Sequence, residues 1–273
     1  MIRKLSLIVL AVLALAGCST EPTVGRVVSE ALTGDLRQYE APSETTRTEI
    51  ADLVRGALNG DKDLATPDQI ELTQVRSNNR NVTVIREQNG RQGMGVYAVR
   101  AGSGSPARLV VEVPHPRADK NTEVLGPLLF EQLNADALLV AGTHRSVADV
   151  AHEPDTVFAS VDEAIVGAGT VVVQLHGFDE SRHSVDAQVV LSSTRAQPSP
   201  LVLRLASALE DADYATCVYD GESCRALAGT ENVEAAHARS VAAEFVHLEL
   251  AVSIRQNGEQ REQLAAILAS VLR

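Results

Sequence analysis

The chain has 273 residues, a formal charge of −12 and an aromatic content of only 3%, with no Trp. This length allows one large domain or two small ones, and the core must be built from Val, Leu, Ile and Ala. Lys and Arg nowhere form a basic block of five or more residues. Because binding to a phosphate backbone needs clustered Lys and Arg, we expect no nucleic-acid partner.

The start of the chain carries the features of a bacterial export signal. A short basic region precedes residues 5–15, an apolar run that is too short to span a membrane comfortably. The Leu-Ala-Gly-Cys18 motif that follows resembles a lipoprotein lipobox, which implies cleavage before Cys18 and acylation of that residue, as by palmitate. An ordinary secretory signal with an incidental Cys is the alternative.

We therefore expect residues 1–17 to be a signal peptide and residues 18–43 to be a lipidated Cys with its tether. The lipid would place the protein in the cell envelope, anchored to a bacterial membrane and facing the periplasm or exterior. Such an anchor suits a chain of this charge, because an anionic membrane repels an anionic protein.

Residues 44–58 carry apolar side chains at helical spacing, and Asn59-Gly60 ends this predicted helix. Short segments of alternating polarity follow, and Asn89-Gly90 is the predicted hairpin turn between two of them. These predicted strands are residues 70–72, 82–85 and 95–100.

From residue 107 onward, predicted strands and helices alternate. The strands are residues 108–114, 137–141, 170–175, 187–191 and 245–251, and the helices are residues 122–133, 161–166, 200–209, 229–243 and 259–272. Alternation of this kind predicts a sheet with helices on both faces. We therefore expect residues 44–273 to form a single α/β domain with three layers, αβα, around a largely parallel or mixed sheet.

Two cysteines remain beside Cys18, and they flank a turn at Asp220-Gly221. In an exported protein, a pair such as Cys217 and Cys224 that closes so short a loop predicts a structural disulfide. Their spacing differs from that of redox-active Cys-x-x-Cys motifs, so we expect the bond to hold a loop near the edge of the sheet.

Three of the predicted apolar strands end in a His, namely His115, His144 and His176, and the last strand carries His247 and Glu249 on one face. A Glu inside an apolar strand is costly unless it is paired or bound to a cation. Because the carboxyl ends of parallel strands meet at one crevice, we expect these side chains to form a site.

Two imidazoles and a carboxylate around an open fourth position are typical of catalytic zinc, so we predict Zn²⁺ as the cofactor. A second carboxylate would then activate water, and Arg145 would supply a fixed positive charge. The sequence contains no Gly-rich phosphate loop and no Gly-x-Ser-x-Gly turn. Their absence argues against a nucleotide-binding protein and against an α/β-hydrolase triad.

The segments PHPRADKNTE, LHGF and FVHLELAVSIR, within residues 80–256, resemble those of the zinc carboxypeptidase-like fold. The similarity is to the branch that holds N-formylglutamate amidohydrolases and poly-γ-glutamate hydrolases. The resemblance implies that His115 and His176 are zinc ligands and that Glu249 is the general base. It also implies that Arg145 binds the oxyanion or the substrate.

The acidic ligand departs from the pattern of the family, because carboxypeptidases use His-x-x-Glu and position 118 here is Ala. The ligand is then Glu123 or Asp119. Glu123 is favoured, because Thr-Glu at a helix start resembles the Ser/Thr-Glu of poly-γ-glutamate hydrolases, and Asp119 is equally suited to cap the helix. Arg255 and His144 are the predicted substrate-binding residues, with a surface position and a plain loop position as their alternatives.

We therefore predict a lipid-anchored, zinc-dependent hydrolase of amide or peptide bonds, acting on small acidic, glutamyl-type or peptide-like substrates. The missing His-x-x-Glu motivates an alternative, a non-catalytic ligand-binding lipoprotein that retains the hydrolase fold. A structural envelope protein with incidental histidines is a third hypothesis, and it predicts that His115, His176 and Glu249 lie scattered in the fold.

Overall fold

A computed structural model of the chain describes residues 22–88, 93–183 and 185–273. The predicted signal peptide, the Cys18 lipidation site and the Asn89-Gly90 turn lie outside the described residues. Within those ranges, no helix is long and apolar enough to cross a membrane.

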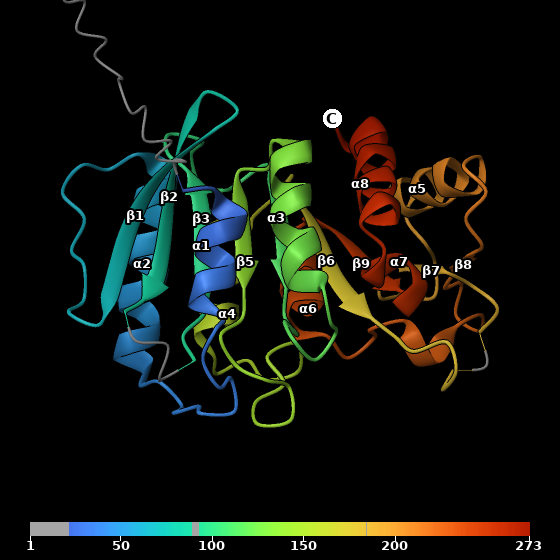
Figure 1. Ribbon diagram of the computed structural model, residues 1–273, viewed down its shortest axis with the longest axis horizontal. Coiled ribbons are helices and arrows are strands. Elements are labelled where there is room, and N and C mark those ends of the chain that lie inside the picture. Colours follow the sequence, from blue (N-terminus) through green and yellow to red (C-terminus); the bar gives the residue numbers. More distant parts are fainter. Residues whose placement is uncertain (1–21, 89–92, 184) are drawn as a thin grey trace, which may run out of the picture.

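In the described residues, nine strands form one mixed sheet. They are β1 (Ile70–Ser77), β2 (Arg80–Glu87), β3 (Val96–Arg100), β4 (Leu109–Val113), β5 (Ala137–Val140), β6 (Val171–Gly177), β7 (Val189–Ser192), β8 (Thr216–Val218) and β9 (Glu244–Leu250). Their order across the sheet is β1-β2-β3-β5-β4-β6-β9-β7-β8 (Figure 1). The four central strands β5, β4, β6 and β9 are parallel, whereas β3 and β7 pair with them in antiparallel fashion.

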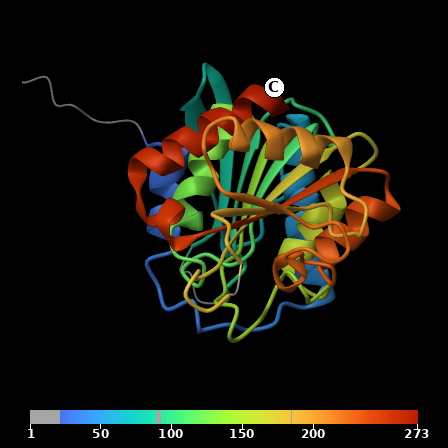
Figure 2. The ribbon, with the colours of Figure 1, turned by 90° about the vertical axis from the view of Figure 1, so that its right-hand side faces the viewer.

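Helices cover both faces of the sheet. They are α1 (Val24–Ala31), α2 (Glu44–Asn59), α3 (Thr122–Leu133), α4 (Val157–Ile165), α5 (Pro200–Glu210), α6 (Val233–Ser240), α7 (Val252–Gln256) and α8 (Gly258–Leu272), with a 3₁₀ helix at Arg225–Leu227. Alternate residues of the strands enter separate cores. On β4, Val111 and Val113 pack under α1, α3, α5 and α8, whereas Val110 packs on the face of α2, α4 and α6. Figure 2 shows the sheet between these layers, which confirms the predicted α/β fold with three layers.

Helix α1 lies inside the segment predicted to be a tether. Val24, Val27 and Val28 recur at helical spacing and are buried in the core beside α3. The side chain of Thr23 accepts a hydrogen bond from the Arg26 N–H and caps the helix. Part of the expected tether is therefore an ordered piece of the domain.

The hairpin between β1 and β2 turns at Asn78-Asn79, a position for which the sequence pattern gives no predicted turn. Both residues have positive φ angles, 48° and 61°, in the left-handed region that Asn tolerates better than most residues. The strands on either side are longer than the predicted segments, because polar residues alternate with the buried ones along them.

The predicted disulfide between Cys217 and Cys224 is confirmed, with a Cα–Cα distance of 6.4 Å. It joins the edge strand β8 to the residue just before the 3₁₀ helix at Arg225–Leu227. The bond therefore fixes the start of this 3₁₀ helix, whose residues line a cavity at the ends of the central strands.

Candidate metal centre

The candidate site lies where the parallel strands β4, β6 and β9 end. In the pairing of β6 with β9, His176 is opposite Glu249, and Gln174 is opposite His247. Because residues two apart point to the same face of a sheet, these four side chains form two rows on the face of α4 and α6. His115 follows β4, the other neighbour of β6, and joins the outer row.

Three of the predicted ligands converge. His115, Asp119 and His176 each offer a ligand atom, and these atoms lie within 4.8 Å of one another. His115 Nδ1 is 3.1 Å from His176 Nδ1 and 3.3 Å from Asp119 Oδ2. A single turn after β4, closed by a 3.0 Å hydrogen bond from the Asp119 N–H to the His115 carbonyl, places this carboxylate beside the imidazole.

Each imidazole is held through its other ring nitrogen. His115 Nε2 lies 2.7 Å from Asp149 Oδ1, and His176 Nε2 lies 2.6 Å from Gln174 Oε1. Both acceptors favour a proton on Nε2, which leaves the two Nδ1 atoms as the ligand atoms. This is the arrangement in which outer hydrogen bonds orient metal-binding histidines.

The charges of the site suit a cation. Burial raises the pKa of Asp119, but hydrogen bonds and charge from His115 and His176 outweigh it and hold that pKa far below the usual range. Burial lowers the pKa of His176 to about 4, assisted by neighbouring His247. Burial also lowers the pKa of His115, but its bonds to Asp119 and Asp149 prevail and raise it. Two imidazole nitrogens and an ionised carboxylate are a donor set that zinc accepts.

Glu123, the favoured acidic ligand in the sequence, is not part of this cluster among the described residues. It lies in the first turn of α3, and its Oε1 is 3.8 Å from Arg117 Nη1. Asp119 reaches the imidazoles because it lies one turn after His115 in the loop. Glu123 lies four residues further on, in helix α3, and its side chain is directed to Arg117. Of the two candidates, Asp119 is the one that the structure brings to the imidazoles.

Glu249 stands beside the cluster on β9. It borders the same cavity as His115 and His176, and its Oε1 is 3.7 Å from His247 Nε2. Within the described part of the chain, Glu249 Oε2 is buried without a hydrogen-bond partner. Buried polar atoms normally have a partner, so this carboxylate oxygen is free to interact with a group bound beside the cluster.

Arg145, in the loop after β5, also reaches the cluster. Its Nη1 is 3.7 Å from Asp119 Oδ1, and its Nη2 is 3.3 Å from Asp149 Oδ2. The side chain is 43% exposed, so the guanidinium also faces solvent in the cleft. Arg145 therefore lies next to the candidate metal ligands, and its role as a fixed positive charge in catalysis stays a prediction.

The two predicted substrate-binding residues, Arg255 and His144, make their hydrogen bonds to groups of the protein itself. Arg255 is buried and donates to the backbone carbonyls of Leu250, Lys120 and Phe178, so it ties together the loops after β4, β6 and β9. His144 Nδ1 lies 2.8 Å from the Ser146 hydroxyl in its own loop. Contact of either residue with a substrate stays a prediction.

Two cavities meet at the cluster. The smaller, of about 230 Å³, includes His115, His176 and His152, and the larger, of about 1090 Å³, extends over Asp119 and the loop after β6. Both are bordered by a shared set of residues, Arg145, Ala226, Leu227 and Glu249. A bound molecule can therefore extend to either side of the metal ligands.

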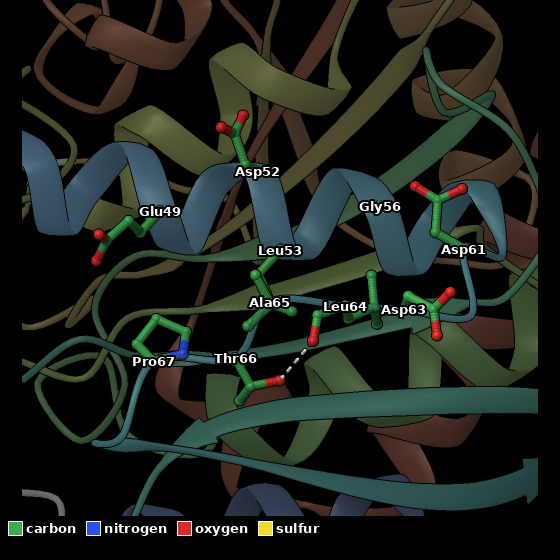
Figure 3. Close-up of a pocket in the computed structure, with 10 residues that line it drawn as sticks. All are labelled: Glu49, Asp52, Leu53, Gly56, Asp61, Asp63, Leu64, Ala65, Thr66 and Pro67. Carbon is green, nitrogen blue, oxygen red and sulfur yellow. Dashed lines mark hydrogen bonds between the residues drawn. The ribbon is translucent and has the colours of Figure 1, made fainter.

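A further cavity of about 520 Å³ lies under α2 and differs in its chemistry. Figure 3 shows its carboxylates, among them Glu49, Asp52 and Asp61, directed away from one another around Leu53 and Leu64. Its described lining contains no His or Cys. Carboxylates that point apart do not form a metal site, so we place the functional centre at the strand ends.

Several polar residues behind the ligands were not predicted to belong to the site. They are Glu112, Asp149, Asp162, Gln174, Asn232, Glu234 and His237. One signal was available, because Glu112 is a carboxylate inside an apolar strand, as Glu249 is. Gln174 lies on β6, two residues before His176, and the remaining residues come from loops and helices whose packing on the sheet a single sequence does not reveal.

No protein-family model and no curated protein matches the sequence. Among solved structures, the chain is similar to a bacteriophage poly-γ-glutamate hydrolase, with 13% identity and a TM-score of 0.42 over 76% of this chain and 90% of that one. It is also similar to a metallo-carboxypeptidase from Burkholderia cenocepacia, with 12% identity and a TM-score of 0.45 over 86% of this chain and 69% of that one. A gene product of Agrobacterium tumefaciens shares 14% identity, with a TM-score of 0.46 over 62% of this chain and 90% of that one. A poly-γ-glutamate hydrolase and a metallo-carboxypeptidase are thus among the matches, as a partial overlap of fold that says nothing of activity.

Proposed function

We propose that the protein is a zinc-dependent hydrolase of amide or peptide bonds, held in the cell envelope by a lipid on Cys18. The observation that carries the proposal is the convergence of His115, Asp119 and His176, with Glu249 beside them at the junction of two cavities. Three ligands from the protein leave a fourth position for water or substrate, as catalytic zinc sites require.

His115 and His176, through Nδ1, and the carboxylate of Asp119 would hold the ion. Zinc in such a site lowers the pKa of water to about 7 and polarises a carbonyl group. Glu249 would accept the proton of the attacking water at a carboxylate oxygen and return it to the leaving amine. Arg145 would offer its charge to the oxyanion that develops on the substrate.

We further infer that the substrates are small and acidic, of the glutamyl or peptide-like type. Arg145 and Arg225 both border the smaller cavity, and Arg225 is exposed there. Among the described residues, no acid pairs with the Arg225 side chain. An unpaired guanidinium is well suited to bind a substrate carboxylate.

The enzyme proposal is tested with the protein from Cys18 onward. We expect one zinc ion per chain by elemental analysis, and hydrolysis of γ-glutamyl or N-acyl amino-acid amides that a chelator abolishes. Glu249→Gln should retain zinc and lose about 10²- to 10⁴-fold in kcat, the usual contribution of a general acid–base. Glu262→Gln, on the exposed side of α8, is the control and should change neither.

The outcomes separate the hypotheses. Absence of stoichiometric zinc, or turnover that resists chelators, would reject the zinc hydrolase. Zinc binding without turnover in either form would instead support the non-catalytic ligand-binding lipoprotein. The anchor is tested separately, because Cys18→Ser should release the full chain from membranes and abolish incorporation of labelled palmitate, and retention of both would refute it.

A further inference from the structure

A second row of polar side chains lies directly beneath the metal ligands. On adjacent strands, Glu112 is opposite Gln174, and both are fully buried. Helix α6 adds Glu234, and Asn232, the N-cap residue that precedes this helix, completes the group. A buried Gln is costly unless both ends of its amide are hydrogen-bonded, and here each end has two partners.

The contacts of Gln174 divide cleanly between its two ends. Its Nε2 donates to Glu112 Oε2 at 2.9 Å and to Glu234 Oε2 at 3.2 Å. Its Oε1 lies 2.7 Å from Asn232 Nδ2 and 2.6 Å from His176 Nε2. The amide group of Gln174 therefore spans the gap between two buried acids and a metal ligand.

The assignment of the oxygen and nitrogen ends of the Gln174 amide follows from the backbone N–H of Ala235, which can only donate a hydrogen bond. Asn232 is the N-cap of α6, and its Oδ1 accepts from the Ala235 backbone N–H at 2.8 Å. Because that oxygen is used by the helix, the nitrogen end of Asn232 must face Gln174. The atom of Gln174 that it meets must then be the oxygen, and only a protonated His176 Nε2 can donate to it.

We propose that Gln174 is a positioning residue, which holds His176 in the Nε2–H form and so directs its Nδ1 lone pair toward Asp119 and His115. The helix cap of α6 sets the orientation of the Asn232 amide, and Asn232 sets the orientation of the Gln174 amide. Gln174 in turn determines which ring nitrogen of His176 carries the proton and which one is free to bind a metal. The claim about the proton on His176 stands without a metal, whereas its value for zinc binding rests on the proposed function.

The acids beneath Gln174 serve as acceptors and do not form a second metal site. Among residues that the structure describes, only the cluster of His115, Asp119 and His176 brings three ligand atoms within range. Burial raises the pKa of Glu112 and of Glu234, and each lies near another acid. A raised pKa reduces the negative charge that a carboxyl group carries at a given pH, and its oxygen accepts from an amide whether or not the group is ionised.

The test compares the full chain with Gln174→Met, which keeps the volume and removes the acceptor. Long-range ¹H–¹⁵N NMR of the metal-free protein should show His176 as the Nε2–H form in the wild type and lose that preference in the variant. Zinc affinity in a competition titration should fall about 10- to 100-fold, as for other outer-sphere partners. Gln74→Met on β1, where Gln74 bonds Thr83 far from the site, is the matched control and should behave as wild type.

A second variant tests the same hydrogen-bond chain in case Gln174→Met does not fold. Asn232→Asp still caps α6 through its carboxylate but cannot donate to Gln174, so it should turn the amide round and shift His176 toward the Nδ1–H form. Unchanged tautomer and zinc affinity in folded Gln174→Met, or in Asn232→Asp, would overturn the positioning role. If no form binds zinc, the proposed function fails, yet the tautomer measurement still decides the role of Gln174.

Discussion

Two groups of carboxylates lie one above the other at the site, an upper group of Asp119 and Asp149 and a lower group of Glu112 and Glu234. Their pKa values are shifted in opposite directions, and this holds even for Asp119 and Glu112, which are both buried. Asp119 in the upper group is 4% exposed, and Glu112 in the lower group is fully buried. The pKa of Asp119 is far below its usual range, whereas the pKa of Glu112 is well above it. The difference lies in their partners, since Asp119 faces two imidazoles and Glu112 faces Asp162 and an amide.

Desolvation alone raises the pKa of every buried acid, so a low pKa requires donors or positive charge close by. His115 and His176 supply them to Asp119, and His115, His152 and Arg145 supply them to Asp149. The upper group is thereby kept anionic where a cation would bind. In the lower group burial raises the pKa values, and both carboxyl groups accept a hydrogen bond from the Gln174 amide.

The largest effect is expected from the upper group. Asp119→Asn removes the only carboxylate among the three ligands, so zinc affinity should fall by more than the roughly 10- to 100-fold typical of an outer partner. Competition titration with a chromophoric chelator measures the change. Asp179→Asn, on the partly exposed loop after β6, is the control, and equal affinities of the two variants would remove Asp119 from the site.

Asp149→Asn should have a smaller effect on the same measurement. The Asn oxygen still accepts from His115 Nε2, but the charge that supports the imidazole is lost, so we expect a decrease of about 10-fold, or 1.4 kcal/mol. Asp155→Asn, an exposed acid of the same loop, is the matched control. A loss as large as that of Asp119→Asn would mean that Asp149 itself binds the ion.

The last effect comes from the lower group, and it concerns the stability of the fold instead of zinc affinity. Burial raises the pKa of Glu112 in the folded state, while in the unfolded chain the carboxyl group ionises above about pH 4.3. The folded state therefore binds more protons above that pH, and the free energy of unfolding falls as pH rises, by up to about 1.4 kcal/mol per pH unit for this group.

Glu112→Gln cannot titrate and should remove this contribution, which makes the protein more stable at pH 8 than the wild type. Urea unfolding at pH 5 and pH 8 measures the difference, with the exposed Glu262→Gln as control. A wild-type protein whose stability rises between these pH values, with the same slope in Glu112→Gln, would show that Glu112 is ionised in the fold.

The comparison also explains what the sequence could predict. The parallel strands, the histidines at their ends and the disulfide follow from local patterns, because strand period and Cys spacing are properties of short segments. The choice of Asp119 over Glu123 depends on a loop turn that joins His115 to α3. Asp149 and Glu234 reach the centre from a loop and a helix whose docking on the sheet no short segment encodes.

The disulfide has a practical consequence for biochemistry on this protein. Cys224 immediately precedes Arg225, and Ala226 and Leu227 form a wall common to both cavities. Thiol reductants in purification or assay buffers would free that wall from the edge strand and alter the surface that a substrate meets. Samples kept oxidised and samples kept in reductant should accordingly be treated as two different reagents when ligands are screened.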